Sequence, residues 1–310
     1  MPPIQYLGVD LCKLELVADL AAEAKPRAFP NEARGHAAFF AALPAGAHVV
    51  CESTGGYQRA LVAALHAAQV PVSVVSPARV RHFARAQGLR AKTDPIDARL
   101  LTAFGQAMAC AALPPPSAEA LELQALVRAR QVLHTQLNVE ASHDEQCTVP
   151  FLQEQAAARK SLLREQIRAI ERRLRALIAA HPRWQARAER VQAVSGIGEV
   201  SAWVVLAELP ELGQLAPGQA GALLGVAPDP NDSGPRQGSR HISGGRSHAR
   251  KVLYMAALTA SQRNPVLAPF YRRLTEQRHK PHRVALTAIM RKLVELLNRL
   301  LADPHFTLAS

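Results

Sequence analysis

The stretch Ile4–Asp10, IQYLGVD, is an apolar run that ends in a carboxylate. A second run, His48–Glu52 with the sequence HVVCE, ends in the same way. Both have the length and composition of buried β-strands. A charge at the end of such a strand is costly to bury unless it is paired or binds a metal. The repeated pattern therefore predicts that Asp10 and Glu52 converge at one functional point, although most single carboxylates in proteins are simply solvated.

Two more carboxylates, Asp94 and Asp97, lie three residues apart in a segment that we expect to be helical, so they share one helix face. Asp94 also suits the N-cap position before Pro95. Four converging carboxylates provide the oxygen ligands that Mg²⁺ prefers. In a strongly basic protein, the substrate expected for such a metal site is a phosphodiester. The neighbouring Lys92 is placed to contact a phosphate or to act as an ordinary counter-charge.

The charge balance indicates a polyanionic partner, either nucleic acid or an acidic membrane surface. The 310 residues carry a formal net charge of +12 with a pI near 10.2, and a chain of this length predicts two domains. From Arg236 to Arg299 there are 14 lysines and arginines but only two acids, Glu276 and Glu295. We therefore expect the polyanion grip in the C-terminal part and the acidic site in the N-terminal part.

Several classes of protein are disfavoured by composition. No apolar stretch of about 18 residues is present, so we expect no membrane span, and we find no signal-peptide pattern. The four cysteines lack a C-x-x-C spacing, which predicts reduced, mostly buried thiols in a cytosolic protein rather than a zinc site. The 12 histidines show no metal-binding spacing. These patterns favour a cytoplasmic protein.

Alternating strand and helix signals predict an α/β domain with one central sheet. The expected helices cover 32–43, with Asn31 as the N-cap, then 58–68, 77–86 and 94–107. The expected strands cover 4–10, 14–20, 47–51 and 71–75.

A proline-rich linker, Leu113–Ser117, ends that domain, and two long helices are expected at 118–142 and 151–180. The second contains a heptad seam that predicts a coiled coil, with steps of four and three residues between Leu163, Ile167, Ile170, Leu174 and Leu177. A hairpin within one chain and a stalk for self-association both fit this pattern.

The last domain, about 184–303, is expected to be helical around an insert rich in glycine, proline and serine at 225–246. At its start, Gly196 and Gly198 form a Gly-x-Gly turn that suits a helix-hairpin-helix. Such a turn lets backbone amides approach a DNA phosphate, although a plain interhelical turn fits as well.

The insert offers a candidate nucleophile, because a serine hydroxyl held near a phosphate by guanidinium groups can attack phosphorus. A basic loop that only hydrogen-bonds phosphates is the simpler interpretation. Composition alone does not rank Ser233, Ser239, Ser243 and Ser247. The expected nucleic-acid contacts of the C-terminal part are Arg236, Arg240, Arg246, Arg250 and Lys251, with Arg236, Arg240 and Arg246 as bidentate phosphate clamps.

Five motifs in order resemble the DEDD-type insertion-sequence transposases, the insertion sequence one-ten family related to the pilin-gene invertases. They are GVD at 8–10, ESTGGY at 52–57, KTDPIDA at 92–98, VSGIG at 194–198, and DSG at 232–234 followed by ISGGR at 242–246 and RKVLYMAAL at 250–258. The similarity extends over nearly the whole chain.

The resemblance implies three parts: a RuvC-like domain of the RNase H fold at 1–112, a linker and coiled-coil stalk at 113–183, and a mainly α-helical transposase domain at 184–310. It implies one or two Mg²⁺ held by the four acids and a nucleophilic serine. Ser233 matches the Ser-Gly position of the family pattern, whereas relatives tolerate threonine at the position of Ser243.

The resemblance also implies partners. These are donor and target DNA, a bridge RNA encoded by the element, and further copies of the chain in a dimer or tetramer. It implies a bacterial cytoplasmic protein that joins the nucleoid when active.

Two other functions compete with RNA-guided transposition. A RuvC-like, metal-dependent Holliday-junction resolvase or nuclease would use water and need the acids but no serine. A non-catalytic scaffold would need neither and would show only salt-sensitive binding.

Overall fold

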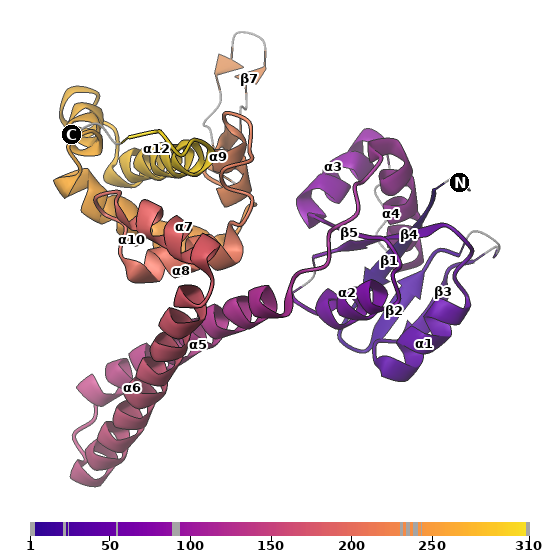
Figure 1. Ribbon diagram of the computed structural model, residues 1–310, viewed down its shortest axis with the longest axis horizontal. Coiled ribbons are helices and arrows are strands. Elements are labelled where there is room, and N and C mark those ends of the chain that lie inside the picture. Colours follow the sequence, from indigo (N-terminus) through magenta and orange to yellow (C-terminus); the bar gives the residue numbers. More distant parts are fainter. Residues whose placement is uncertain are drawn as a thin grey trace. The chain divides into compact units, whose positions relative to one another are not determined.

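The computed structural model describes residues 4–20, 23, 25–53, 55–88, 94–229, 232–233, 236–237, 241–242 and 244–307; for 94–96, 229, 232–233 and 236–237 it describes the backbone alone. The chain forms two compact units, residues 1–116 and 117–310, each of which is described by itself (Figure 1).

The N-terminal unit contains one five-stranded sheet in the order β3-β2-β1-β4-β5. Strand β1 pairs antiparallel with β2 and parallel with β4, which in turn pairs parallel with β5. The strands are β1 (Gln5–Leu11), β2 (Glu15–Ala18), β3 (Arg27–Pro30), β4 (Ala47–Glu52) and β5 (Val72–Val75). The helices are α1 (Ala33–Ala41), α2 (Gln58–Ala67), α3 (Pro77–Ala86) and α4 (Asp94–Met108).

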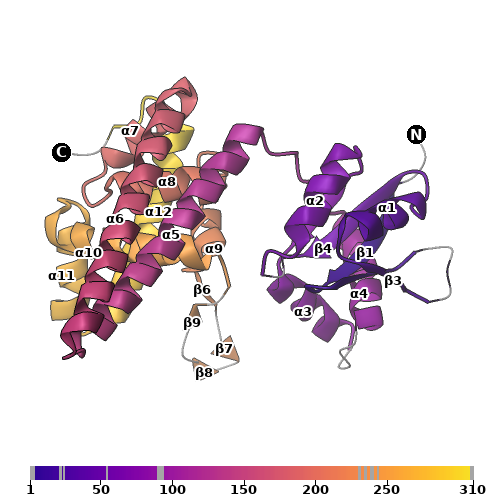
Figure 2. The same cartoon turned by 90° about the horizontal axis from the view of Figure 1, so that it is seen from below.

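Helices cover both faces of this sheet, because successive residues of a strand point to opposite sides. On one face Val9 and Cys51 pack with Phe39 of α1 and Leu61 of α2. On the other face Val50 and its neighbours pack against α3 and α4. Figure 2 shows the sheet between the α1/α2 pair and the α3/α4 pair. The predicted α/β domain with one sheet is confirmed.

Two local predictions in this unit are wrong. Asn31 does not cap α1, whose N-cap residue is Glu32. The Asn31 side chain instead hydrogen-bonds His36 at 2.9 Å and the Cys12 carbonyl at 2.9 Å. The cysteines are free, but only Cys51 is buried. Burial, reinforced by the charge of neighbouring Glu52, raises the pKa of the Cys51 thiol to about 12.

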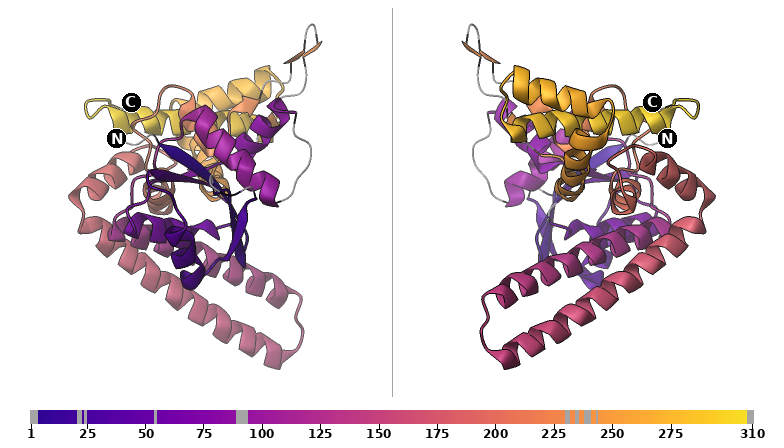
Figure 3. Two further views of the ribbon diagram at one scale, coloured as in Figure 1. Left: turned by 90° about the vertical axis from the view of Figure 1, so that its right-hand side faces the viewer. Right: turned by 90° about the vertical axis from the view of Figure 1, so that its left-hand side faces the viewer.

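The C-terminal unit begins with a long helical hairpin of α5 (Ala118–Glu145) and α6 (Pro150–Ala179), shown side by side in Figure 3. Buried Ile167, Leu174 and Leu177 belong to the predicted heptad seam. Interhelix ion pairs establish the antiparallel direction, since rising numbers on α5 meet generally falling numbers on α6. They join Glu122 to Arg173, Arg130 to Glu171, Glu140 to Arg159 and Asp144 to Lys160.

The base of this hairpin is attached to the helical body around one buried aromatic ring. The guanidinium carbons of Arg130 and Arg175 lie 5.8 and 5.5 Å from the ring centroid of Trp203, which is 3% exposed. Arg175 also donates two hydrogen bonds of 2.7 Å to Glu199, and these hydrogen bonds lower the pKa of that carboxyl group. Cation–π contacts of this kind are favourable when the ring is buried.

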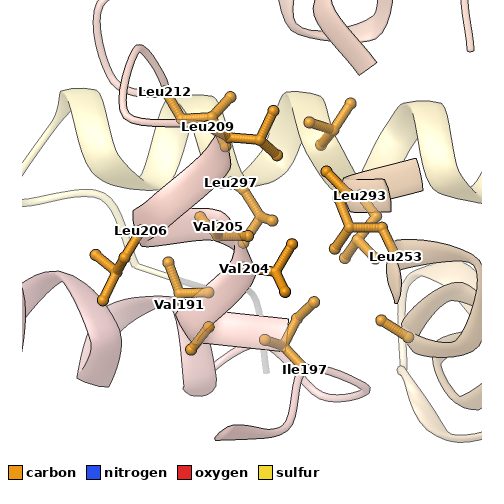
Figure 4. Packing of buried hydrophobic residues seen from close by; sticks show 14 of the residues in the cluster. Val191, Ile197, Val204, Val205, Leu206, Leu209, Leu212, Leu253, Leu293 and Leu297 are labelled. Atoms are coloured by element: carbon orange, nitrogen blue, oxygen red, sulfur yellow. The ribbon is translucent and has the colours of Figure 1, made fainter. Parts of the chain in front are cut away.

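The body itself is a helical bundle around one apolar core. Figure 4 shows leucine, isoleucine and valine side chains from several helices, among them Val205, Leu253 and Leu297, meeting in its centre. Its helices are α7 (Pro182–Gln192), α8 (Glu199–Glu208), α9 (Gln219–Leu224), α10 (Ser247–Arg263), α11 (Leu267–Arg272), the π-helical turn η1 (Arg273–Gln277) and α12 (His282–Ala302). None of the helices described is both long and apolar enough to cross a membrane.

Candidate active site

Two of the predicted acids lie at the carboxyl ends of neighbouring strands. Val9 of β1 pairs with Cys51 of β4 in parallel register, and Asp10 and Glu52 are the residues that follow them. Both are partly exposed. The Oδ1 atom of Asp10 accepts a hydrogen bond of 3.0 Å from the Leu11 amide. The register therefore brings Asp10 and Glu52 to one edge of the sheet.

Helix α4 approaches β1 so closely that no side chain fits between them at Gly8. A Cβ atom built on Gly8 would lie 2.0 Å from the Ala98 carbonyl oxygen and 2.6 Å from the Leu101 Cβ. Such distances are far inside van der Waals contact. Glycine at this position lets the helix that carries Asp97 lie directly against the strand that carries Asp10.

Asp97 lies on the side of α4 that faces the sheet. It precedes Leu101 and Phe104 by four and seven residues, and both of these are buried against β4 and β5. Positions with this spacing share one helix face. The Asp94 side chain and all of Lys92 lie outside the described residues. Sheet register and helix face together give Asp10, Glu52 and Asp97 a common side of the domain.

The donor chemistry suits a hard divalent cation, because carboxylate oxygens are the ligands that Mg²⁺ prefers. Among the residues with described side chains, no three histidine, cysteine or acidic groups form a ready metal cluster. The fourth predicted acid, Asp94, is not part of that set. The acids therefore fit a cation by ligand type, and sheet register brings two of them, Asp10 and Glu52, to the same edge.

A partly buried series of hydrogen bonds beside this edge was not predicted. The Gly8 amide donates to Thr102 Oγ1 at 2.8 Å, and the Thr102 hydroxyl donates to Asp19 Oδ2 at 2.7 Å. Asp19 also lies 3.9 Å from the Arg99 guanidinium. These hydrogen bonds link β1 to α4 at Thr102, between one and two helical turns after Asp97. Only the contact between segments far apart in sequence reveals it.

The Gly-x-Gly turn between α7 and α8 is shaped mainly by packing at its first glycine. Gly196 has a φ of +106°, and a Cβ on it would lie 2.8 Å from the Ala260 Cβ of α10. Gly198 is the N-cap residue of α8 and has open space around its Cα. Because Glu199 holds Arg175 at the start of α8, that helix end already has a charged partner. Of the two glycines predicted to contact phosphate, only Gly198 has open space around its Cα.

The insert that carries the candidate serine contains two short antiparallel ladders. Strand β6 (Pro228–Asp229) pairs with β9 (His241–Ile242), and β7 (Asp232–Ser233) pairs with β8 (Arg236–Gln237). In the second ladder the backbone of Ser233 is the register partner of Arg236. The predicted residues Ser239, Arg240 and Ser243 lie outside the described residues, as do the side chains of Ser233 and Arg236.

The neck of this insert, which we define as residues 224–226 and 244–246, is a close crossing of two backbone segments. Gly225 and Gly245 have φ angles of +76° and +68°. A Cβ on Gly225 would lie 2.3 Å from the Gly244 oxygen, and a Cβ on Gly245 would lie 2.3 Å from the Gly225 nitrogen. Glycine is required at both positions by conformation and by space.

Two arginines expected to bind phosphate, Arg246 and Arg250, have hydrogen-bond partners within the protein. Arg246 forms a bidentate ion pair with Glu211 and donates to the Glu208 carbonyl. Arg250 Nη1 donates to the carbonyls of Gly244 at 2.6 Å, Gly225 at 3.2 Å and Leu224 at 3.3 Å. The Arg250 contacts hold the start of α10 to the end of α9, and the Arg246 contacts hold it to the end of α8 and the segment that follows α8. Lys251 is exposed.

The ion pair at the neck also fixes the charge of its acidic partner. Burial acts to raise the pKa of Glu211, but its hydrogen bonds and attraction to Arg246 prevail and lower it. His248 adds a third link, with Nδ1 2.6 Å from Glu208 Oε1 and Nε2 3.1 Å from Gln131 Oε1. The insert therefore leaves the body through a tightly bonded base.

Comparison with known proteins accounts for both units. Residues 8–144 match a DEDD transposase family of the IS110 type, and residues 188–272 match the family described as "Transposase IS116/IS110/IS902 family". The chain is also similar to two proteins described as "Pilin gene-inverting protein", from Moraxella lacunata and Moraxella bovis. Each is 27% identical over 254 residues, which cover 80% of this chain and 78% of the relative. The chain therefore belongs to the IS110-type transposases and is a DNA recombinase.

Proposed function

We propose that this recombinase cleaves and exchanges DNA strands through a covalent serine–DNA intermediate, with Mg²⁺ at the N-terminal acids and an RNA of the element as guide. The observation that carries the proposal is the register of β1 and β4, which takes Asp10 and Glu52 to one edge of the sheet beside α4.

Asp10, Glu52, Asp94 and Asp97 would hold the cation. When bound, a divalent cation stabilises negative charge that develops on the phosphate oxygens. The sheet positions Asp10 and Glu52, and the contact of α4 with Gly8 positions Asp97. Carboxylates alone would repel a phosphodiester, so the basic C-terminal unit would supply the opposite charge.

Ser233 is the proposed nucleophile. Its Oγ forms a bond to phosphorus, the bond from phosphorus to the oxygen of the released strand end breaks, and the serine proton passes to that oxygen, which becomes a hydroxyl group. The hydroxyl of the incoming strand then attacks the same phosphorus, the Oγ–P bond breaks, and serine regains a proton. No water is consumed, so phosphodiester bonds are exchanged rather than lost.

Partner choice and assembly belong to the same proposal. Base pairing between RNA and DNA would supply the sequence specificity, while the protein recognises backbone and helix shape, as in other guided systems. We propose that the chain works as a homo-oligomer, dimer or tetramer, in the bacterial cytoplasm. The part boundaries 1–112, 113–183 and 184–310 remain our proposal for the division of labour.

The test uses purified protein, Mg²⁺, the RNA that flanks the element, and labelled donor and target DNA. Wild type, Ser233→Ala, Asp10→Ala and Ser239→Ala are compared on a denaturing gel. We expect a protein-linked DNA band in wild type and in the matched control Ser239→Ala. We expect none in the other two variants, and recombinant product only with RNA.

Other results would separate the competing functions. Cleavage that persists in Ser233→Ala but stops in Asp10→Ala would identify a different nucleophile. Adding Ser243→Ala then distinguishes that serine from water, and water would indicate a metal-dependent resolvase. Absence of cleavage in every protein, wild type included, with equal DNA binding by wild type and both variants, would indicate a non-catalytic scaffold.

A further inference from the structure

Exposed cations are concentrated in the segment of the chain that follows α10 and α11. We define the basic corner as Arg272, Arg273, Arg278, Lys280 and Arg283, which run from the last residue of α11 through η1 into the first turn of α12. All five are exposed, and Glu276 is the one acid between residues 272 and 283.

The backbone of this corner is held in a defined shape. The Arg278 amide donates to the Arg273 carbonyl at 3.1 Å, and the Lys280 amide donates to the Leu274 carbonyl at 2.9 Å. Tyr271 Oη and His282 Nδ1 are 2.9 Å apart and link the two sides of the turn. The cations are therefore presented by an ordered turn, which lowers the entropy lost on binding a ligand.

Packing beneath the corner supports the same conclusion. The guanidinium carbon of Arg273 lies 5.2 Å from the centroid of the Phe270 ring, and the Lys292 ammonium lies 4.6 Å from that centroid. Leu274 is 9% exposed and anchors η1 to the body. Basic side chains at this surface thus rest on an apolar platform.

The corner differs from the hairpin in how its charges are balanced. On α5 and α6, arginines such as Arg130 and Arg173 meet carboxylates at 2.8 and 2.6 Å. Within the described part of the chain, no ion pair joins a corner cation to a carboxylate. Five cations in one short segment with a single acid, Glu276, leave an excess of positive charge, which favours binding of a polyanion.

We infer that the basic corner binds the phosphodiester backbone of duplex DNA beside the site of strand exchange. The neck of the insert directly precedes α10, and the corner begins at the last residue of α11, the helix that follows α10. Seventeen helical residues span roughly 25 Å, or about seven base pairs at 3.4 Å each. A DNA segment of this length would run from the neck of the insert along α10 toward the segment that carries the corner. The family match in this unit ends at residue 272, so the corner extends past it.

The test compares two triple variants of the full chain that lose the same charge. Arg278→Gln, Lys280→Gln and Arg283→Gln together remove three of the five positive charges of the corner. Arg164→Gln, Arg168→Gln and Arg172→Gln together neutralise an exposed face of α6. Affinity for a duplex of about 30 base pairs, and for a structured RNA of similar length, is measured as a function of salt, and circular dichroism confirms that both variants are folded.

The affinity for DNA decreases with salt, and for the corner variant we expect this decrease to be less steep. The magnitude of the slope of log affinity against log salt should be smaller by about two to three, because each lost phosphate contact removes about 0.9. Affinity for DNA near physiological salt should fall on the order of tenfold or more. The α6 variant should keep the wild-type slope. Equal slopes in the two variants would overturn the inference, and so would a loss seen with RNA but not with DNA.

Discussion

At the scale of single residues, Gly8 is the tightest position of the candidate site. Its replacement by alanine would press a methyl group into the Ala98 carbonyl and force α4 away from β1. Overpacking of this kind costs roughly 1–3 kcal/mol of stability. We expect Gly8→Ala to increase hydrogen exchange in α4 and to reduce DNA cleavage.

Gly198→Ala is the control, because its φ of −94° is ordinary and its Cα faces open space. Unchanged exchange in α4 of Gly8→Ala would contradict the close approach of helix and strand.

Arg250 and Lys251 provide a second residue-scale prediction. They are adjacent cations on α10, but Arg250 contacts three neck carbonyls whereas Lys251 is exposed. We expect Arg250→Gln to raise hydrogen exchange over residues 224–226 and 244–250 and to slow strand cleavage, with a small change in the Kd for DNA. Lys251→Gln should leave exchange at the neck unchanged.

The opposite pattern is expected if both side chains bind phosphate. In that case the two variants would weaken DNA binding equally and leave the neck protected from exchange.

At the scale of elements, His48 joins β4 to β5 and the segment that follows α4. Its Nε2 lies 2.8 Å from Ser73 Oγ, which donates to the Ala111 carbonyl at 2.7 Å. Since that serine donates its proton to Ala111, it accepts one from His48 Nε2. Burial lowers the pKa of His48 below its usual value of 6.5.

A pH prediction follows from that lowered pKa. As pH falls below about 6.5, the unfolded chain takes up the His48 proton before the folded chain does, so stability present at pH 7 is lost toward pH 5. We expect urea titrations to show this loss. It should be smaller in His48→Gln and unchanged in His82→Gln, which alters an exposed histidine. Equal losses in all three proteins would rule out the neutral buried ring.

At the scale of the whole molecule, the acids proposed to bind metal and the cations proposed to bind DNA belong to different units. The acids are in the N-terminal unit, and the cations of the basic corner are in the C-terminal unit. We expect chelation of divalent metal to abolish strand cleavage while DNA binding persists and stays strongly dependent on salt. Restored Mg²⁺ should recover cleavage. Cleavage in excess chelator would refute the role proposed for the acids.

Much of the fold could be predicted from local patterns. The runs before Asp10 and Glu52 are strands, and the helices over 58–67, 77–86 and 94–108 lie within a residue or two of expectation. Strand β3 was missed, because it is a short edge strand with three exposed positions among its four residues and so lacks a hydrophobic signal. Asn31 was misassigned because its partner, His36, becomes available only when the helix has formed.

The sequence by itself determined the acids, the strand–helix alternation and the uneven charge, because hydrophobic periodicity and composition are properties of neighbouring residues. Only the tertiary structure decided that Gly8 must be glycine, that Arg246 pairs with Glu211 and that Arg250 binds carbonyls of the neck. It also decided that no carboxylate of the described residues forms an ion pair with the basic corner. Each of these depends on contacts between segments tens of residues apart. An arginine carries the same charge whether it faces Glu211 or a phosphate, so folding selects its partner.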